Sequence, residues 1–346
     1  MLIVLDTSAV IPDFYFQGPS LGALLSECYR VPATIAISEV VRAELVVNHR
    51  RRLEKLRDEV EKFRGCFLGY RSSVLPDSQI DDLEDQYVAW VNNHLRLKCI
   101  PLPMPSLSHA AIIERMAMVR RPFQEGGRGY KDFLIWRSII EWLLVNKEDI
   151  CFVSENKKDF SDASGGMHPD LLAEMDSFSI DRKRIRYYET AKDCYEKEIA
   201  PHLEKLNDIA HSLMQGRYEH LDLEKWLYGQ WDVVLAETTF DPDNFAPDEG
   251  YASATVKGLR RAALSSVFQV TRLGSANIVI EFFVNTTLDL ELSRPMRSTV
   301  TNRGWNEVDS SSRPFEIHMI LSFDETSRKV LNYEVADISP IVFEHE

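Results

Sequence analysis

The first 200 residues alternate short apolar runs with longer amphipathic stretches, and this alternation constrains the fold more than any other feature. The apolar runs occupy 2–5, 34–37, 150–153 and 184–188, and the helical patterns occupy 37–63, 79–97, 108–121 and 131–146. Helices that connect successive strands produce βαβ units and a parallel sheet. We therefore predict an α/β domain over residues 1–200, with a helical insertion over about 49–125 and a proline-punctuated connection at 98–108.

The pattern changes after about residue 200. Two helical stretches, 204–214 and 221–231, precede short segments that mostly alternate polar and apolar residues, at 231–237, 253–259, 277–285, 286–293, 315–323 and 330–338. The last two flank a turn-like stretch at 324–329, which predicts an antiparallel hairpin. Residues 201–346 are therefore expected to form a C-terminal α+β domain with antiparallel strands.

Charge and cysteine content limit the partners and the compartment. The chain has a net charge of −14, and residues 201–346 hold 13 basic and 23 acidic side chains. Such acidity argues against a general coat for polyanions, so any contact with nucleic acid should fall on the first domain. The five cysteines form no CxxC pair and no apolar run approaches the ~20 residues of a membrane span, so we expect reduced thiols, a cytoplasmic location and no membrane contact.

Four acidic residues occupy corresponding places in the first domain. Asp6 and Asp159 follow two predicted strands, while Glu44 and Asp132 lie early in two predicted helices. Each has an ordinary structural explanation as a cap, turn or solvated residue. Together, however, they can meet at the carboxyl edge of the sheet, where crowded carboxylates repel one another unless a cation neutralises them. Oxygen ligands alone favour Mg²⁺ or Mn²⁺.

The motifs around these residues resemble a known family. LDTSAV at 5–10, ISEVVRAEL at 37–45, a buried helix headed by Lys-Asp at 131–132, and FVSENKKDF at 152–160 look like the PIN domain. The stretch 120–142 is similar to a PIN-like branch of uncharacterised function. The resemblance covers about residues 1–190 and implies a PIN-like (Rossmannoid) parallel sheet flanked by helices, together with a metal-dependent nuclease activity, usually on RNA.

The resemblance also implies roles for individual residues. Asp6, Glu44, Asp132 and Asp159 would be the catalytic metal ligands, supported by Ser8, Glu155 and Asn156. The implied reaction is in-line attack of a metal-activated water on a phosphodiester, which leaves a 5′-phosphate and a 3′-hydroxyl. For substrate binding we single out the residues nearest the Asp132 motif: Arg121, Arg128, Tyr130 and Lys131. The basic run at 49–57 is better explained as a solvated helix face.

Three functions are consistent with this reading. The first is an endoribonuclease, with phage defence or a toxin-like role suggested by analogy alone. The second is a structure-specific DNA nuclease, since spacing does not reveal contacts to the 2′-hydroxyl. The third is an inactive PIN-like scaffold that binds a protein. In each, the acidic second domain is expected to mediate homodimerisation, regulatory partner binding or autoinhibition.

Overall fold

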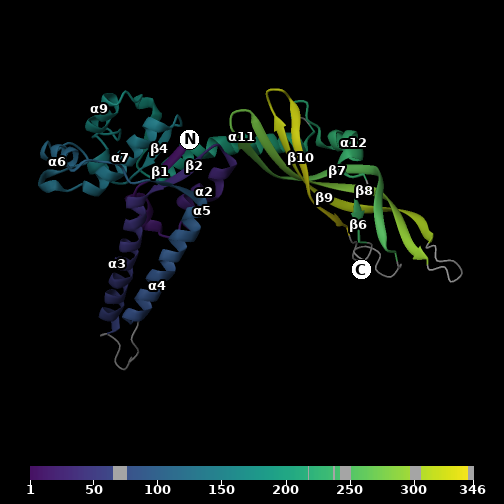
Figure 1. The fold of residues 1–346 in the computed structure, drawn as a ribbon, viewed down its shortest axis with the longest axis horizontal. Helices are drawn as coiled ribbons and strands as arrows, with labels where there is room; N and C mark the ends of the chain where they lie inside the picture. The colour runs from purple at the N-terminus through teal and green to yellow at the C-terminus, as the bar shows by residue number, and fades with distance from the viewer. Residues whose placement is uncertain (65–75, 217, 237, 242–250, 297–304, 342–346) are drawn as a thin grey trace. The chain divides into compact units, whose positions relative to one another are not determined.

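The protein is described here from a computed structural model, which divides into two compact units, Met1–Pro201 and His202–Glu346 (Figure 1). The structure describes residues 1–64, 76–216, 218–236, 238–241, 251–296 and 305–341. The first unit contains a parallel sheet flanked by helices and the second an antiparallel sheet, so the predicted fold class is confirmed.

The sheet of the first unit has five parallel strands in the order β3-β2-β1-β4-β5. These are β1 Leu2–Leu5, β2 Thr34–Ser38, β3 Cys99–Leu102, β4 Ile150–Val153 and β5 Ile185–Tyr188. The central strand β1 is buried throughout, and its last residue, Leu5, lies between Ile37 of β2 and Val153 of β4. The chain leaves β1 and β4 side by side at the edge where parallel sheets usually bind ligands.

Strand β3 lies where the sequence predicts only a connection. Its four residues pair with β2 in parallel, so the stretch 49–125 contributes an edge strand as well as helices. Pro101 disguises the strand, because proline lacks the amide that an internal strand needs. Proline is tolerated at the edge of a sheet, and β3 is such an edge.

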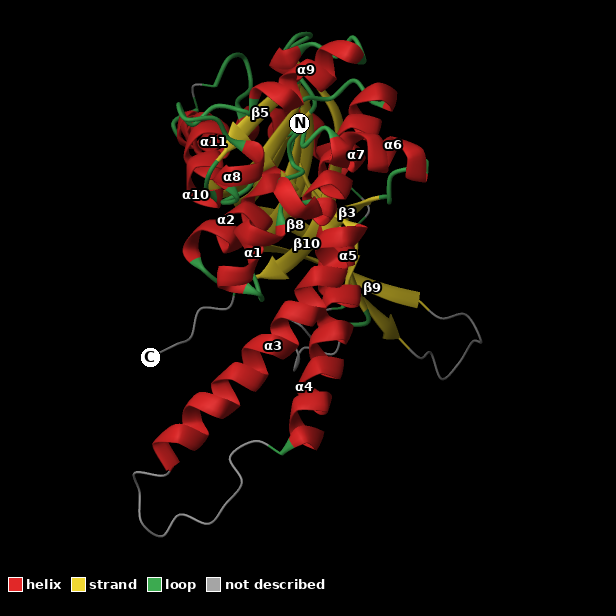
Figure 2. Ribbon diagram, turned by 90° about the vertical axis from the view of Figure 1, so that its left-hand side faces the viewer, coloured by secondary structure: helices red, strands yellow, loops and turns green. Residues whose placement is uncertain are grey.

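Helices cover both faces of the sheet, with α2 and α10 on one side and α6 and α7 on the other (Figure 2). Most of α7 is buried, as its nearly continuous apolar sequence predicts. Among the described residues, no helix combines the length and apolarity needed to cross a bilayer. The α-helices of the first unit are α1 Thr7–Val10, α2 Pro19–Glu27, α3 Glu39–Arg64, α4 Asp77–Trp90, α5 Arg96–Lys98, α6 His109–Ala117, α7 Tyr130–Val145, α8 Lys157–Phe160, α9 Pro169–Ser177 and α10 Ala191–Cys194.

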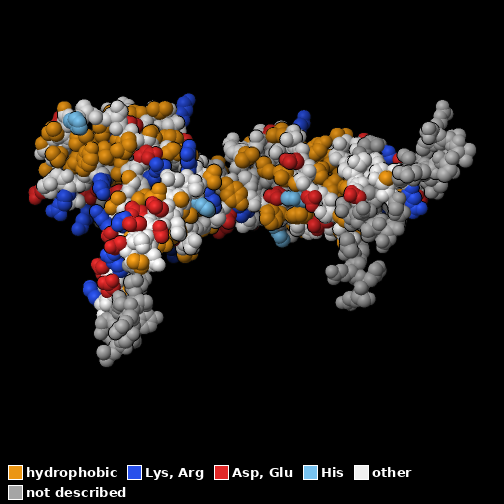
Figure 3. All heavy atoms as spheres, turned by 60° about the horizontal axis from the view of Figure 1, so that its bottom comes forward, with side chains coloured by type: hydrophobic (Ala, Val, Ile, Leu, Met, Phe, Trp, Pro, Cys, Tyr) orange, Lys and Arg blue, Asp and Glu red, His pale blue; other side chains and the backbone are white. Residues whose placement is uncertain are grey.

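Helices α3 and α4 form a projecting arm. Charged side chains of both signs cover it (Figure 3), and Arg50 of α3 pairs with Glu54 on its own helix and with Asp81 and Glu84 on α4. These pairs support the interpretation of the basic run as a solvated face. At the base of the arm, the ring of His49 stacks on Tyr87 with centroids 3.9 Å apart.

The second unit is built on long antiparallel strands in the order β10-β9-β8-β7-β6. Their bounds are β6 Thr239–Phe240, β7 Ser253–Leu273, β8 Asn277–Met296, β9 Trp305–Asp324 and β10 Lys329–Pro340. The predicted hairpin is present, with Val330 opposite Phe323, and the segments 277–285 and 286–293 join into the single strand β8. Alternate residues of β8, from Ile278 to Leu292, are buried, so one face of the sheet carries the core.

Helices α11 (Ala200–Met214) and α12 (Leu223–Val234) precede these strands. The prediction of a strand over 231–237 is wrong for residues 231–234, because α12 continues to Val234 and the amide of Leu235 still bonds to the Trp231 carbonyl. Two side chains of α12 bind the edge of β7. The Tyr228 hydroxyl bonds to both Arg260 O and Ala262 N, and Glu224 accepts from Leu264 N. The helix thereby satisfies backbone groups that an open strand edge would leave unpaired.

Candidate active site

Asp6 is a buried carboxylate at the end of β1, where it also caps the short helix α1. Its Oδ2 accepts hydrogen bonds from the hydroxyls of Ser8, at 2.6 Å, and Ser154, at 2.7 Å. Burial raises the pKa of Asp6 above its usual range, while these hydroxyl donors oppose the shift. Ser8 therefore supports Asp6, and Ser154, which follows β4 directly, is a second support that the sequence motifs do not identify.

Asp132 and Asp159 are brought together by the side-chain amide of Asn156. This amide donates to Asp132 Oδ1 and to Asp159 Oδ2, each at 2.9 Å. Burial raises the pKa of Asp132 to about 6, and the charges of Asp6 and Asp159 add to that shift. Three predicted aspartates, from the ends of β1 and β4 and the first turn of α7, are thus within electrostatic reach of one another.

Glu44 lies beside this group, on α3. Its carboxylate accepts from the hydroxyl of Thr7, the residue after Asp6, at 2.6 Å, and it forms an ion pair with Lys131 at 2.5 Å. Lys131 immediately precedes Asp132. Glu44 is therefore linked to both neighbouring carboxylates through the residues adjacent to them in the chain.

Asp159 accepts hydrogen bonds from two polar side chains of the loop before α7. The Arg121 guanidinium lies 3.3 Å from Asp159 Oδ1, and the Gln124 amide donates to the same oxygen at 2.5 Å. Arg121 is a predicted substrate contact, and here it partly neutralises a carboxylate. Gln124 has no recognisable signal in the sequence, because its role depends on how the loop folds back over α8.

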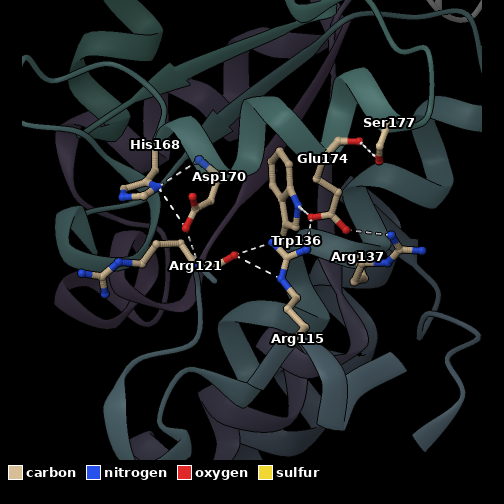
Figure 4. Close-up of polar contacts among 8 residues, drawn as sticks. All are labelled: Arg115, Arg121, Trp136, Arg137, His168, Asp170, Glu174 and Ser177. Atoms are coloured by element: carbon tan, nitrogen blue, oxygen red, sulfur yellow. Dashed lines mark hydrogen bonds and ion pairs between the residues drawn. The ribbon is translucent and has the colours of Figure 1, made fainter. Parts of the chain in front are cut away.

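A buried ionic cluster holds the backbone that carries Arg121 (Figure 4). Glu174 of α9 accepts from Arg115, Arg137 and Trp136 at 2.6, 2.9 and 2.7 Å. The Arg115 guanidinium also bonds to the carbonyl of Arg121, whose amide donates to Asp170 at 3.0 Å. Helix α9 therefore positions Arg121 directly through its amide, and indirectly through its carbonyl by way of Arg115.

Gly129 determines how this loop joins α7. Its φ is +94°, and a Cβ at this position would lie 2.0 Å from the carbonyl oxygen of Pro122. A side chain is therefore excluded on grounds of both conformation and space. This close approach sets the start of α7 and, with it, the positions of Lys131 and Asp132.

The other predicted site residues lie around the aspartates. Glu155 is exposed, and its backbone amide, at 2.9 Å, donates to the Ser8 hydroxyl, so its main chain rather than its carboxylate joins the network. Arg128, in the loop that leads into α7, is exposed. Tyr130, the first residue of α7, retains 46% of its surface. Both are accessible to a ligand near Asp132.

The donor chemistry of the site fits a hard divalent cation, because it consists of carboxylate, hydroxyl and amide oxygens. Across the described residues, no three His, Cys, Asp or Glu side chains gather closely enough to form a ready-made metal site. The contacts above explain this spacing: Asn156 separates Asp132 from Asp159, while Arg121 and Lys131 occupy positions beside two of the four carboxylates.

Residues 3–160 match the family model described as PIN domain, a range that includes all four carboxylates and ends before the second unit. No curated protein and no solved structure matches the chain significantly.

Proposed function

With a PIN domain over residues 3–160 as the premise, we propose that this protein is a divalent-metal-dependent endoribonuclease. PIN domains are generally metal-dependent nucleases. The observation that carries the proposal is the convergence of Asp6, Asp132 and Asp159. Burial, together with the charges of Asp6 and Asp159, raises the pKa of Asp132 to about 6. Such crowding of carboxylates lowers the stability of the fold unless a bound cation neutralises their charges.

Asp6, Asp132 and Asp159, with Glu44 beside them, would hold Mg²⁺ or Mn²⁺. Such an ion supplies an activated water and neutralises charge on the phosphodiester. The residues around the carboxylates then have distinct tasks. Ser8 and Ser154 orient Asp6, while Asn156 orients both other aspartates. Orientation of ligands by such neighbours commonly changes metal affinity or activity by 10–100-fold.

Arg121 and Lys131 have a second task in this proposal. Without a metal they neutralise Asp159 and Glu44. With a divalent cation held by the carboxylates, Arg121 and Lys131 would be free to contact the phosphates of the strand, and the exposed Arg128 and Tyr130 would extend the same surface. In the substrate complex, the metal ion would therefore neutralise the carboxylates, and Arg121 and Lys131 would neutralise the phosphates.

The second unit is assigned no part in the chemistry. Its acidic balance, 13 basic against 23 acidic side chains, disfavours contact with a polyanion. We propose that it forms a homodimer or binds a regulatory protein, with the whole protein acting in the cytoplasm in a toxin-like or defence role.

The test is a cleavage assay on single-stranded RNA, transfer RNA and DNA with Mg²⁺ or Mn²⁺. Asp6→Asn keeps the size of the side chain and removes its charge, so cleavage should fall by at least ~100-fold, more than for a supporting residue. Asp176→Asn, which changes an exposed aspartate paired with Arg182, serves as the control. Full activity in Asp6→Asn would refute the assignment, and preference for DNA would replace the ribonuclease by a DNA nuclease.

A further inference from the structure

An apolar groove of about 410 Å³ runs between α3 and α7 beside the carboxylates. Val40 and Leu134 form its nearly buried floor, while Val47 and Met104 stand at its walls with 48% and 55% of their surfaces exposed. Its volume falls in the range of pockets that bind small organic groups. Exposed aliphatic side chains facing a cavity of this size indicate a surface that an apolar ligand would cover.

The groove is continuous with the candidate active site. Glu44 and Lys131 line the groove, and the same two residues form the ion pair beside Asp6 and Asp132. A ligand that lies in the groove therefore reaches the carboxylates without crossing another surface. Arg51 adds a second cationic side chain to the lining, further along α3.

We propose that this groove binds a nucleobase of the substrate strand, next to the phosphate at the carboxylates. The inference rests on the proposed function, since it takes a nucleic acid as the ligand. The largest apolar surface of a single strand is on the faces of its bases, which match the aliphatic walls formed by Val47 and Met104. Its phosphates match the cationic groups of Lys131 and Arg51. The two carboxylates of the lining, Glu39 and Glu44, are paired with Arg42 and Lys131. The lining contains no aromatic side chain, so the base is held between aliphatic groups and binds without strong sequence preference.

The experiment compares hexauridylate with the same ribose-phosphate hexamer lacking bases, by fluorescence anisotropy on the full chain. Ca²⁺ is present as the divalent ion, and each strand is verified as intact after the measurement. The wild-type protein should bind the strand with bases several-fold more tightly, because a base in the groove removes apolar surface from water. Val47→Gln should lose several-fold in affinity for hexauridylate and nothing for the abasic strand. Val60→Gln is the matched control, because Val60 is an exposed valine of the same helix outside the groove.

Photocrosslinking gives an independent readout. Hexauridylate carrying 4-thiouridine should crosslink to the groove residues, Met104 or Val47 among them, as located by mass spectrometry. Equal losses for Val47→Gln on both strands, or crosslinks confined to other surfaces, would overturn the proposal. The proposal would also be overturned if Val47→Gln changed the sedimentation coefficient of the protein while binding both strands as the wild type does. The groove would then be assigned to contact with a second protein copy.

The outcomes separate this inference from the nuclease proposal. If the wild-type protein cleaves RNA with Mn²⁺ but Val47→Gln behaves like Val60→Gln, the nuclease stands and the base site is wrong. If base-dependent binding at Val47 is present but no divalent ion supports cleavage, the base site stands and the nuclease is wrong.

Discussion

Asn156 donates one amide group to both Asp132 and Asp159, at 2.9 Å each, and thereby holds two carboxylates together that would otherwise repel. The residue follows β4 by three positions, whereas Asp132 lies in the first turn of α7. This bridge joins two separate elements of the sheet edge into one acidic site, and its electrostatic consequence is testable without a substrate.

The first prediction concerns the pH dependence of stability in Asp132→Asn. The pKa of Asp132 is raised to about 6 in the folded protein from an ordinary value of 3.8, so the ionised form is penalised on folding. This penalty is absent below about pH 4 and complete above about pH 6. Asp132→Asn removes it, and urea unfolding should show a gain of about 1–2 kcal/mol at pH 8 that shrinks toward pH 5.

Asp162→Asn provides a control of opposite sign. Hydrogen bonds from the Ser164 hydroxyl and from backbone amides lower the pKa of Asp162, so its ionised form stabilises the fold. That contribution is present above about pH 4 and disappears as the pH falls further. Replacement of Asp162 should therefore reduce stability at pH 8. A gain for both variants, or for neither, would contradict the conclusion that burial and the neighbouring charges penalise the ionised form of Asp132.

The second prediction concerns Arg121→Gln. The Arg121 guanidinium lies 3.3 Å from Asp159 and competes with any cation there. Its removal should tighten Mn²⁺ binding to the substrate-free protein by about fivefold, as expected for roughly 1 kcal/mol of charge competition. It should also weaken binding of single-stranded RNA. Electron paramagnetic resonance of free Mn²⁺ measures the first effect and fluorescence anisotropy the second.

Arg182→Gln is the matched control, because Arg182 forms an exposed ion pair with Asp176. Neither affinity should change in this variant. If Arg121→Gln weakened Mn²⁺ binding instead, Arg121 would be a structural support of the metal site rather than a competing charge.

The third prediction concerns the ionic cluster in Figure 4. Glu174→Gln leaves the charges of Arg115 and Arg137 without their partner in a largely buried position. Breaking such a cluster should destabilise the protein by about 2–4 kcal/mol. Asp176→Asn breaks an exposed pair on the same helix, where water screens the charges, and should cost far less than the change at Glu174. Similar urea midpoints for the two variants would show that burial does not amplify the Glu174 pairs.

The fourth prediction concerns the edge of the second sheet. Tyr228→Phe removes a hydroxyl that bonds to Arg260 O and Ala262 N on β7. Unfolding of the second unit should require about 1 kcal/mol less free energy, the usual contribution of one hydrogen bond. Tyr130→Phe, at the exposed start of α7 in the first unit, should leave that transition unchanged. A neutral Tyr228→Phe would mean that water replaces the hydroxyl at this edge.

Much of the first unit could be predicted because its signals are local. The four-residue apolar runs of β1 and β4 and the buried sequence of α7 identify their elements directly, and the resemblance to the PIN domain is confirmed by the family match. Strand β3 escaped prediction because Pro101 imitates a connection. The position of β3 at the edge of the sheet depends on tertiary structure, which a local sequence pattern does not predict.

The carboxylates of the candidate site, with several supporting and substrate-binding side chains, could be predicted from the sequence, but the contacts that join them could not. Ser154 and Gln124 were missed because each becomes relevant through a partner far along the chain, Asp6 and Asp159 respectively. Arg121 was identified by its charge, yet its contact with Asp159 depends on the loop held by α9. Tertiary packing determines which side chains neutralise the carboxylates, and a local sequence pattern does not predict such contacts.

The most direct measurement is anomalous X-ray scattering from a crystal of the wild-type protein soaked in Mn²⁺. The account predicts a peak within coordination distance of Asp6 together with Asp132 or Asp159, accompanied by withdrawal of Arg121 from Asp159. A crystal that binds no Mn²⁺ among these carboxylates, with Arg121 and Lys131 still paired to Asp159 and Glu44, would contradict it.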